Sequence, residues 1–144
     1  MKKIIWISSY PKSGNTWMRY LLSNYFYNIK KKFDPNIIAH IKKFQIYNDI
    51  KKDSSKTMAI KNNPYEISKY WIRTQEILTE KINDAFFLKN HNACLKIENN
   101  KFTNDELTLG SIYIVRDPRD VVVSYAKYSN LSYDMTIEKL LTDK

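Results

Sequence analysis

Residues 8–17, SSYPKSGNTW, combine residue types that hold an anion. The segment leads into a helical pattern, and the free amides and positive dipole end of a helix N-terminus attract phosphate-like groups. Gly14 allows a tight turn or a close approach of the backbone to a ligand. Lys12 adds a mobile positive charge. The segment predicts a phosphate site, although on its own an ordinary turn explains it equally well.

The familiar phosphate-binding motifs are excluded. A Walker loop requires G-x-x-x-x-G-K-[ST], and a dinucleotide fingerprint requires G-x-G-x-x-G. The chain contains only two glycines, Gly14 and Gly110. In addition, Lys12 precedes its glycine, which argues against a nucleoside kinase.

A second anion-binding segment is IYIVRDPRDVVVSY, residues 112–125. An apolar strand pattern ends at Arg116, and a helix then begins with Asp117 as its cap and Pro118 at its first position. Ser124 lies about two helical turns beyond Arg116. The planar guanidinium and the hydroxyl are therefore able to hold one anion between them.

Imidazole can accept a proton near neutral pH, because its reference pKa is about 6.5. The chain has two histidines. His91 directly follows an apolar run, whereas His40 lies in a polar stretch and is predicted to be a partly exposed helix residue. Taken alone, His91 is more typical of a structural or surface histidine than of a catalytic base.

Strands that alternate with helices predict an α/β fold with a parallel sheet, whose ligands lie at the carboxyl ends of the strands. The expected buried strands are 2–9, 84–91 and 109–117. The expected helices are 16–28, one after Pro35, 64–82 with Asn63 as its cap, 117–129 and 135–144. Segments 9–17, 89–94 and 116–124 should then meet at one edge of the sheet.

Apolar residues at helical spacing predict one apolar face on the first helix. They are Trp17, Met18, Leu21, Leu22, Tyr25 and Phe26. Tyr70 and Trp71 lie in another helical stripe and are expected in the core. The lysine pairs at 42–43 and 51–52 are interpreted as solvated charges. Lys89, two residues before His91, could face the same cleft, but a lysine at a strand end is more often solvated.

The 144 residues carry a net charge of +9 and one cysteine. This length fits a single domain, and the charge suits a polyanionic partner. Cys94 excludes an internal disulfide and is expected to be a small buried residue. No run reaches the roughly 18 apolar residues of a membrane span, and the start turns polar too soon for a signal peptide. We therefore expect a soluble, cytoplasmic protein without membrane partners.

Three motifs together resemble one family. YPKSGNTW resembles the 5'-phosphosulfate loop of the sulfotransferases that use 3'-phosphoadenylyl sulfate (PAPS), and IYIVRDPRDVVVSY resembles their 3'-phosphate segment. FLKNHNA, residues 87–93, resembles the segment that carries their catalytic histidine. The resemblance spans residues 4 to about 130. It implies a P-loop-NTPase-like sulfotransferase fold, with a central parallel sheet flanked by helices.

The resemblance also implies a role for each matching residue. Lys12 would contact the 5'-phosphate and bridging oxygen of PAPS, and His91 would be the base. The residues that would cradle the 5'-phosphosulfate are Ser13, Gly14, Asn15 and Thr16. Trp17 would stack on adenine, while Arg116 and Ser124 would hold the 3'-phosphate. Asn15 stands where the family commonly has threonine.

The implied reaction transfers a sulfuryl group from PAPS to a hydroxyl or amine of a small-molecule or glycan acceptor, releasing 3',5'-adenosine bisphosphate (PAP). No metal is required, because an ammonium and helix-end amides can stabilise the leaving oxygen. The resemblance gives no indication of which acceptor is used.

The family's C-terminal donor-binding segment, Arg-Lys-Gly followed by Gly-Asp-Trp-Lys, has no counterpart, since no glycine follows Gly110. We therefore expect residues 1–144 to be the N-terminal part of a sulfotransferase domain. Two other interpretations stay open. One is a catalytically impaired module that binds PAPS or PAP. The other is a basic nucleic-acid-binding protein, which the dispersed lysines disfavour.

Overall fold

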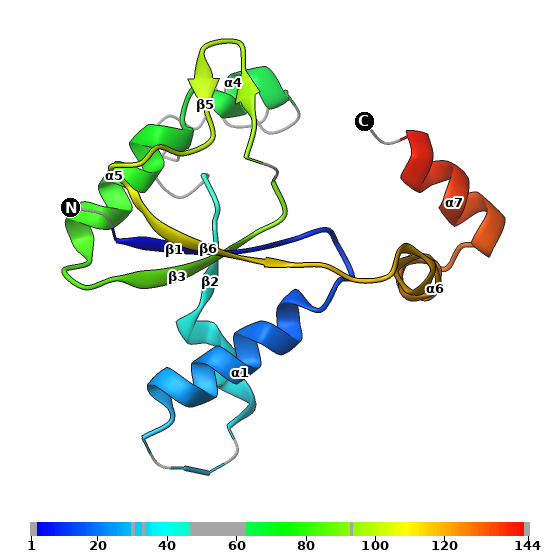
Figure 1. Ribbon diagram of the computed structural model, residues 1–144, viewed down its shortest axis with the longest axis horizontal. Coiled ribbons are helices and arrows are strands. Elements are labelled where there is room, and N and C mark those ends of the chain that lie inside the picture. Colours follow the sequence, from blue (N-terminus) through cyan, green and yellow to red (C-terminus); the bar gives the residue numbers. More distant parts are fainter. Residues whose placement is uncertain (1–2, 30, 33, 47–62, 93, 143–144) are drawn as a thin grey trace, which may run out of the picture.

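The computed structural model describes residues 3–29, 31–32, 34–46, 63–92 and 94–142. Its centre is a parallel four-stranded sheet with the order β2-β3-β1-β6 (Figure 1). The strands are β1 (Ile4–Ser9), β2 (Lys42–Lys43), β3 (Phe86–Asn90) and β6 (Thr108–Ile114). A separate antiparallel pair consists of β4 (Lys96–Ile97) and β5 (Asn100–Lys101). The expected α/β fold with a parallel sheet is confirmed.

Helices flank the sheet on both faces (Figure 1). They are α1 (Asn15–Tyr27), the 3₁₀ helix η1 (Pro35–His40), α4 (Pro64–Ser68), α5 (Trp71–Lys81), α6 (Pro118–Ser129) and α7 (Tyr133–Thr142). The predicted caps are confirmed, because Asn63 accepts from the amide of Tyr65 and Asp117 from that of Arg119. The single helix expected over 64–82 is wrong: the chain forms two helices that are separated at residues 69–70.

The main core lies on the α5 face of the sheet. Trp6 of β1 packs against Phe44 and Phe102 with ring centroids 5.3 and 5.1 Å away, and Trp71 contacts Phe102 at 5.4 Å. The indole nitrogen of Trp6 also donates to the hydroxyl of Thr108. Burial of these aromatic rings stabilises β1 at the centre of the sheet. It thereby fixes the position of the segment that follows β1.

The opposite face of the sheet is covered by α1, and most of the apolar stripe predicted on α1 is exposed. Trp17, Leu21 and Tyr25 are 75%, 61% and 83% exposed, respectively. The buried residues of α1 are instead Asn15 and Ser23. Hydrophobic spacing predicts the helix correctly, but it cannot show which neighbour, if any, covers the apolar face.

Arg19 of α1 holds η1 against the helix. Its Nε donates to the carbonyl of Ile41 at 2.9 Å, and its Nη2 donates to the carbonyl of Ile38 at 3.1 Å. A cation is favourable at this helix end, because the helix dipole places partial negative charge there. Because Ile41 directly precedes β2, these bonds also fix the start of that strand.

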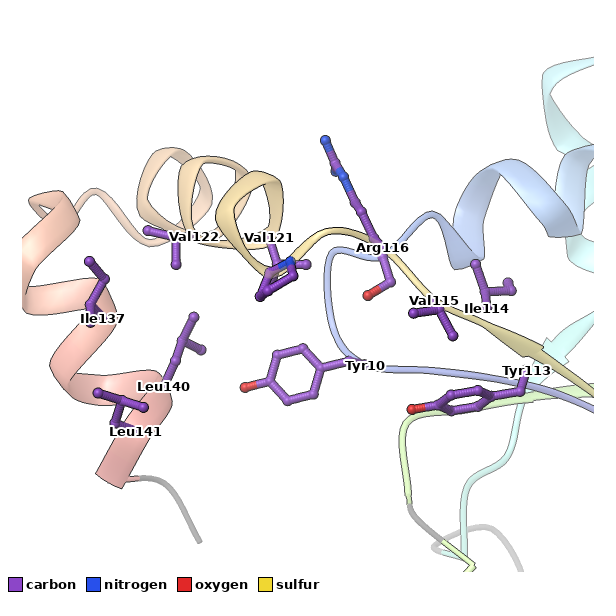
Figure 2. A pocket seen from close by; sticks show the side chains of 12 residues that line it. Tyr10, Tyr113, Ile114, Val115, Arg116, Val121, Val122, Ile137, Leu140 and Leu141 are labelled. Carbon is purple, nitrogen blue, oxygen red and sulfur yellow. The ribbon is translucent and has the colours of Figure 1, made fainter.

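Strand β6 is an edge strand that pairs with β1 alone among the described residues. The expectation of a buried strand at 109–117 is therefore wrong in its burial: Leu109, Tyr113 and Val115 are 52%, 69% and 78% exposed. Beyond its end, apolar side chains of α6 and α7 face Tyr10 across a cavity (Figure 2).

We expect the isolated 144-residue chain to associate or to unfold at a low temperature, because an exposed apolar edge strand is a template for pairing. Sedimentation over a range of concentrations checks this. Replacing Leu109 with lysine should shift the distribution toward monomer. A single monomer peak for the unmodified chain together with a cooperative melt would refute the expectation.

Two single-residue expectations have different outcomes. Cys94 is exposed, so the expected burial is wrong. His40 is exposed as expected and stacks on Tyr27 with ring centroids 4.8 Å apart. The sequence interpretations of residues 47–62 lie outside the described residues.

Candidate functional site

A cavity of about 560 Å³ lies at the carboxyl edge of the sheet. It is lined by eight of the predicted site residues, namely Lys12, Gly14, Asn15, Thr16, Trp17, His91, Arg116 and Ser124. They come from the loop after β1, from α1, from the end of β3 and from the segment after β6. Ser13 does not line it: this residue is buried and faces the neighbouring apolar cavity.

The loop after β1 contains two residues with left-handed backbone. Gly14 has φ +105° and Lys12 has φ +68°. Glycine adopts such angles without a steric penalty, whereas a lysine there costs energy that the surrounding structure must offset. The amide of Ser13 donates to the carbonyl of Tyr10 at 3.2 Å and closes the turn. This geometry brings the chain sharply from β1 into α1.

The N-terminus of α1 is open toward this cavity. No side chain caps it, and the first bond of its first turn runs from Met18 to the carbonyl of Gly14. The amides of Asn15, Thr16 and Trp17 therefore lack partners within the helix. Together with the helix dipole, such amides can hold an anionic oxygen.

Lys12 lies beside these amides. Its Nζ is 4.2 Å from the ring centroid of Tyr128 on α6, a cation–π contact. Such contacts contribute about 0.5–1 kcal/mol at exposed sites. Tyr128 therefore directs the ammonium across the cavity without neutralising its charge.

Arg116 connects the segment after β6 with the loop after β1. Its Nη1 donates to the carbonyl of Lys12 at 3.0 Å, and its Nε lies 3.8 Å from a carboxylate oxygen of Asp120. The guanidinium keeps further N–H groups for a ligand, since arginine has five. Ser124 of α6 lines the same cavity. Arg116 thus has a role in loop structure as well as a place in the cavity.

His91 is oriented by the end of β1. Its Nδ1 lies 2.8 Å from the carbonyl oxygen of Ser9 and 3.3 Å from the Ser9 hydroxyl. A carbonyl only accepts, so in the neutral ring Nδ1 carries the hydrogen and Nε2 carries the lone pair. Burial lowers the pKa of His91, the Ser9 bond opposes that shift, and the charges of Lys89 and Lys43 lower it further. The net effect favours the neutral imidazole, which is the form that can accept a proton.

Asn15 reaches the same strand end from α1. Its Nδ2 donates to the carbonyl of Ile7 at 3.0 Å and to the hydroxyl of Ser9 at 3.1 Å. The side chain thus faces β1, which leaves only its backbone amide for an anion. Ser9 therefore contacts both Asn15, at the start of α1, and His91, and so fixes their positions relative to each other.

Replacing Asn15 with alanine should lower the free energy of unfolding by about 1–3 kcal/mol, because two buried hydrogen bonds contribute about 0.5–1.5 kcal/mol each. Chemical denaturation measures the change. The matched control is Asn24→Ala, because Asn24 is exposed on the same helix and donates to Tyr20. Equal losses in both variants would contradict the structural role of Asn15.

Sequence reasoning missed several lining residues: Pro11, Lys43, Tyr125 and Tyr128. Lys89 lines the cavity too, which agrees with the less favoured of the two interpretations of this residue, that it faces the same cleft as His91. Lys43 had no local signal, since it reaches the cavity only because β2 pairs with β3.

The fold and the cavity define an α/β protein with an uncapped helix N-terminus at a strand–loop–helix junction and a histidine in the same cavity. A family model described as a sulfotransferase domain matches residues 2–142. The chain therefore belongs to the sulfotransferase domain family, whose members transfer sulfuryl groups. A comparison with curated proteins gives no match. Among the described residues, no helix is both long and apolar enough to cross a membrane.

Proposed function

We propose that the protein transfers a sulfuryl group from PAPS to a hydroxyl or amine acceptor by in-line displacement. The observation that carries this proposal is the presence in one cavity of uncapped helix-end amides, the Lys12 ammonium and the His91 imidazole. A polyanionic donor requires the first two groups, and deprotonation of an acceptor requires the third.

The donor would lie along the loop and α6. The amides of Gly14 to Trp17 would hold the 5'-phosphosulfate. Ser13, which is buried, would complete the loop that presents these amides. Arg116 and Ser124 would hold the 3'-phosphate, and Trp17, which is largely exposed, would offer its face to adenine.

In the transfer step, the acceptor oxygen or nitrogen forms a bond to sulfur as the bond from sulfur to the bridging oxygen breaks. The bridging electron pair stays on the 5'-phosphate of PAP, where Lys12 would stabilise the charge. The acceptor proton would pass to Nε2 of His91. By analogy with phosphoryl transfer, positioning and electrostatics would supply most of the rate.

A calorimetric titration tests the donor site directly. PAP should bind the folded chain about 10- to 100-fold more tightly than 5'-AMP, because a charge-assisted hydrogen bond contributes about 1.5–3 kcal/mol. Transfer from radiolabelled PAPS to a panel of phenols, alcohols, amines and glycans then tests turnover. Equal affinity for PAP and 5'-AMP would refute the assignment of the donor site.

Two further parts of the proposal come from the sequence. The reaction would take place in the cytoplasm, and neither nucleic acid nor a membrane would be a partner. If the protein bound nucleic acid with an affinity that falls steeply with salt, and showed no preference for PAP, nucleic acid would instead be its partner.

A further inference from the structure

Lys43 and Lys89 form a basic pair on one side of the cavity. They are register partners in the adjacent parallel strands β2 and β3, so their side chains emerge on the same face of the sheet. Both line the cavity that contains His91. They are close enough to each other for the Lys43 charge to lower the pKa of Lys89, although burial is the larger cause.

The basic pair lies on the opposite side of the cavity from Arg116. The strand order β2-β3-β1-β6 places β2 at one edge of the sheet and β6, which leads into Arg116, at the other. The loop after β1 (residues 10–14) lies between these two edges, and His91 follows β3. A donor that spans the loop and Arg116 therefore occupies the β1–β6 side. Lys43 is left on the far side of His91, where the acceptor must approach.

Among the described residues, no carboxylate offsets the basic pair. The lining residues of the cavity in this part of the chain include no aspartate or glutamate. Within the described part of the chain, no ion pair involves Lys43 or Lys89. Two adjacent like charges beside a partly desolvated site are unfavourable unless a ligand of opposite charge joins them.

We propose that the acceptor carries an anionic group, a carboxylate, phosphate or sulfate, which Lys43 binds with Lys89 beside it while the reacting hydroxyl or amine faces His91. This inference rests on the proposed function and specifies its acceptor class. An anion at this position would also offset the two positive charges that disfavour protonation of His91, and so assist its action as a base.

Matched acceptor pairs test the inference by binding, without requiring turnover. We would titrate 4-hydroxybenzoate against its methyl ester, and glucose 6-phosphate against glucose, into the chain alone and into the chain saturated with PAP. The anionic member of at least one pair should bind about 10-fold or more tightly. Lys43→Met should abolish this preference, and Lys43→Arg should retain it.

The control is Lys42→Met. Lys42 is the neighbouring exposed residue of β2 but does not line the cavity, so its loss should leave the preference intact. Equal affinity for both members of each pair, or affinity for none of them, would overturn the inference. So would a Lys43→Met variant that loses PAP affinity to the same extent, because Lys43 would then serve the donor. Failure of PAP itself to bind would refute the proposed donor site, and the titrations without PAP would still report on the basic pair.

Discussion

Replacing Lys12 with methionine is expected to lower the rate of sulfuryl transfer by about 10²- to 10³-fold, the usual effect of removing one donor aimed at developing charge. Methionine keeps the unbranched shape but lacks the ammonium. The loss should appear mainly in kcat, because charge accumulates on the bridging oxygen in the transition state. Steady-state kinetics with PAPS measures it.

The affinity for PAP separates binding from catalysis in this experiment. Lys12→Met should weaken PAP only modestly, since the helix-end amides remain, whereas the double variant Lys12→Ala, Arg116→Ala should lose binding. Arg119→Ala is a suitable control, because Arg119 is 90% exposed, pairs with Asp117 and does not line the cavity. Unchanged kcat in Lys12→Met would contradict the role given to Lys12.

Local sequence signals predicted the parts of the site that belong to single strand–loop–helix units. The apolar run before residue 10, Gly14 and the helical pattern after it specify the turn that gives α1 an open N-terminus. Asp117 and Pro118 specify the start of α6 in the same way. Because parallel strands end at a common edge, the meeting of these units with His91 also followed from the pattern.

The features that sequence reasoning missed depend on tertiary neighbours. The burial of β6 and of the apolar face of α1 depends on what packs against them, which spacing does not encode. Lys43 resembles any solvated lysine until the pairing of β2 with β3 brings it beside Lys89. Asn15 was expected to help cradle the anion, but its side chain is directed to Ser9 and Ile7 by contacts within the folded structure.

Replacing His91 with alanine should lower turnover by about 10²- to 10⁴-fold, the range for loss of a general base. PAP affinity should stay within about twofold, because the proposed donor contacts lie on the loop and α6. His40→Ala is the matched control, since His40 stacks on Tyr27 away from the cavity. A His91→Ala variant with full activity would exclude the proposed base.

The pH dependence of the rate gives a second, independent test of the role of His91 as the base. Only the neutral ring accepts a proton, so activity should rise with pH through the pKa of His91 and level off above it. Burial and the charges of Lys89 and Lys43 lower that pKa from 6.5, which places the midpoint of the rise below 6.5. Lys89→Met removes a like charge, which favours the protonated ring, raises the pKa and should move the midpoint to higher pH. A midpoint that does not move would mean that a group other than His91 controls the rate.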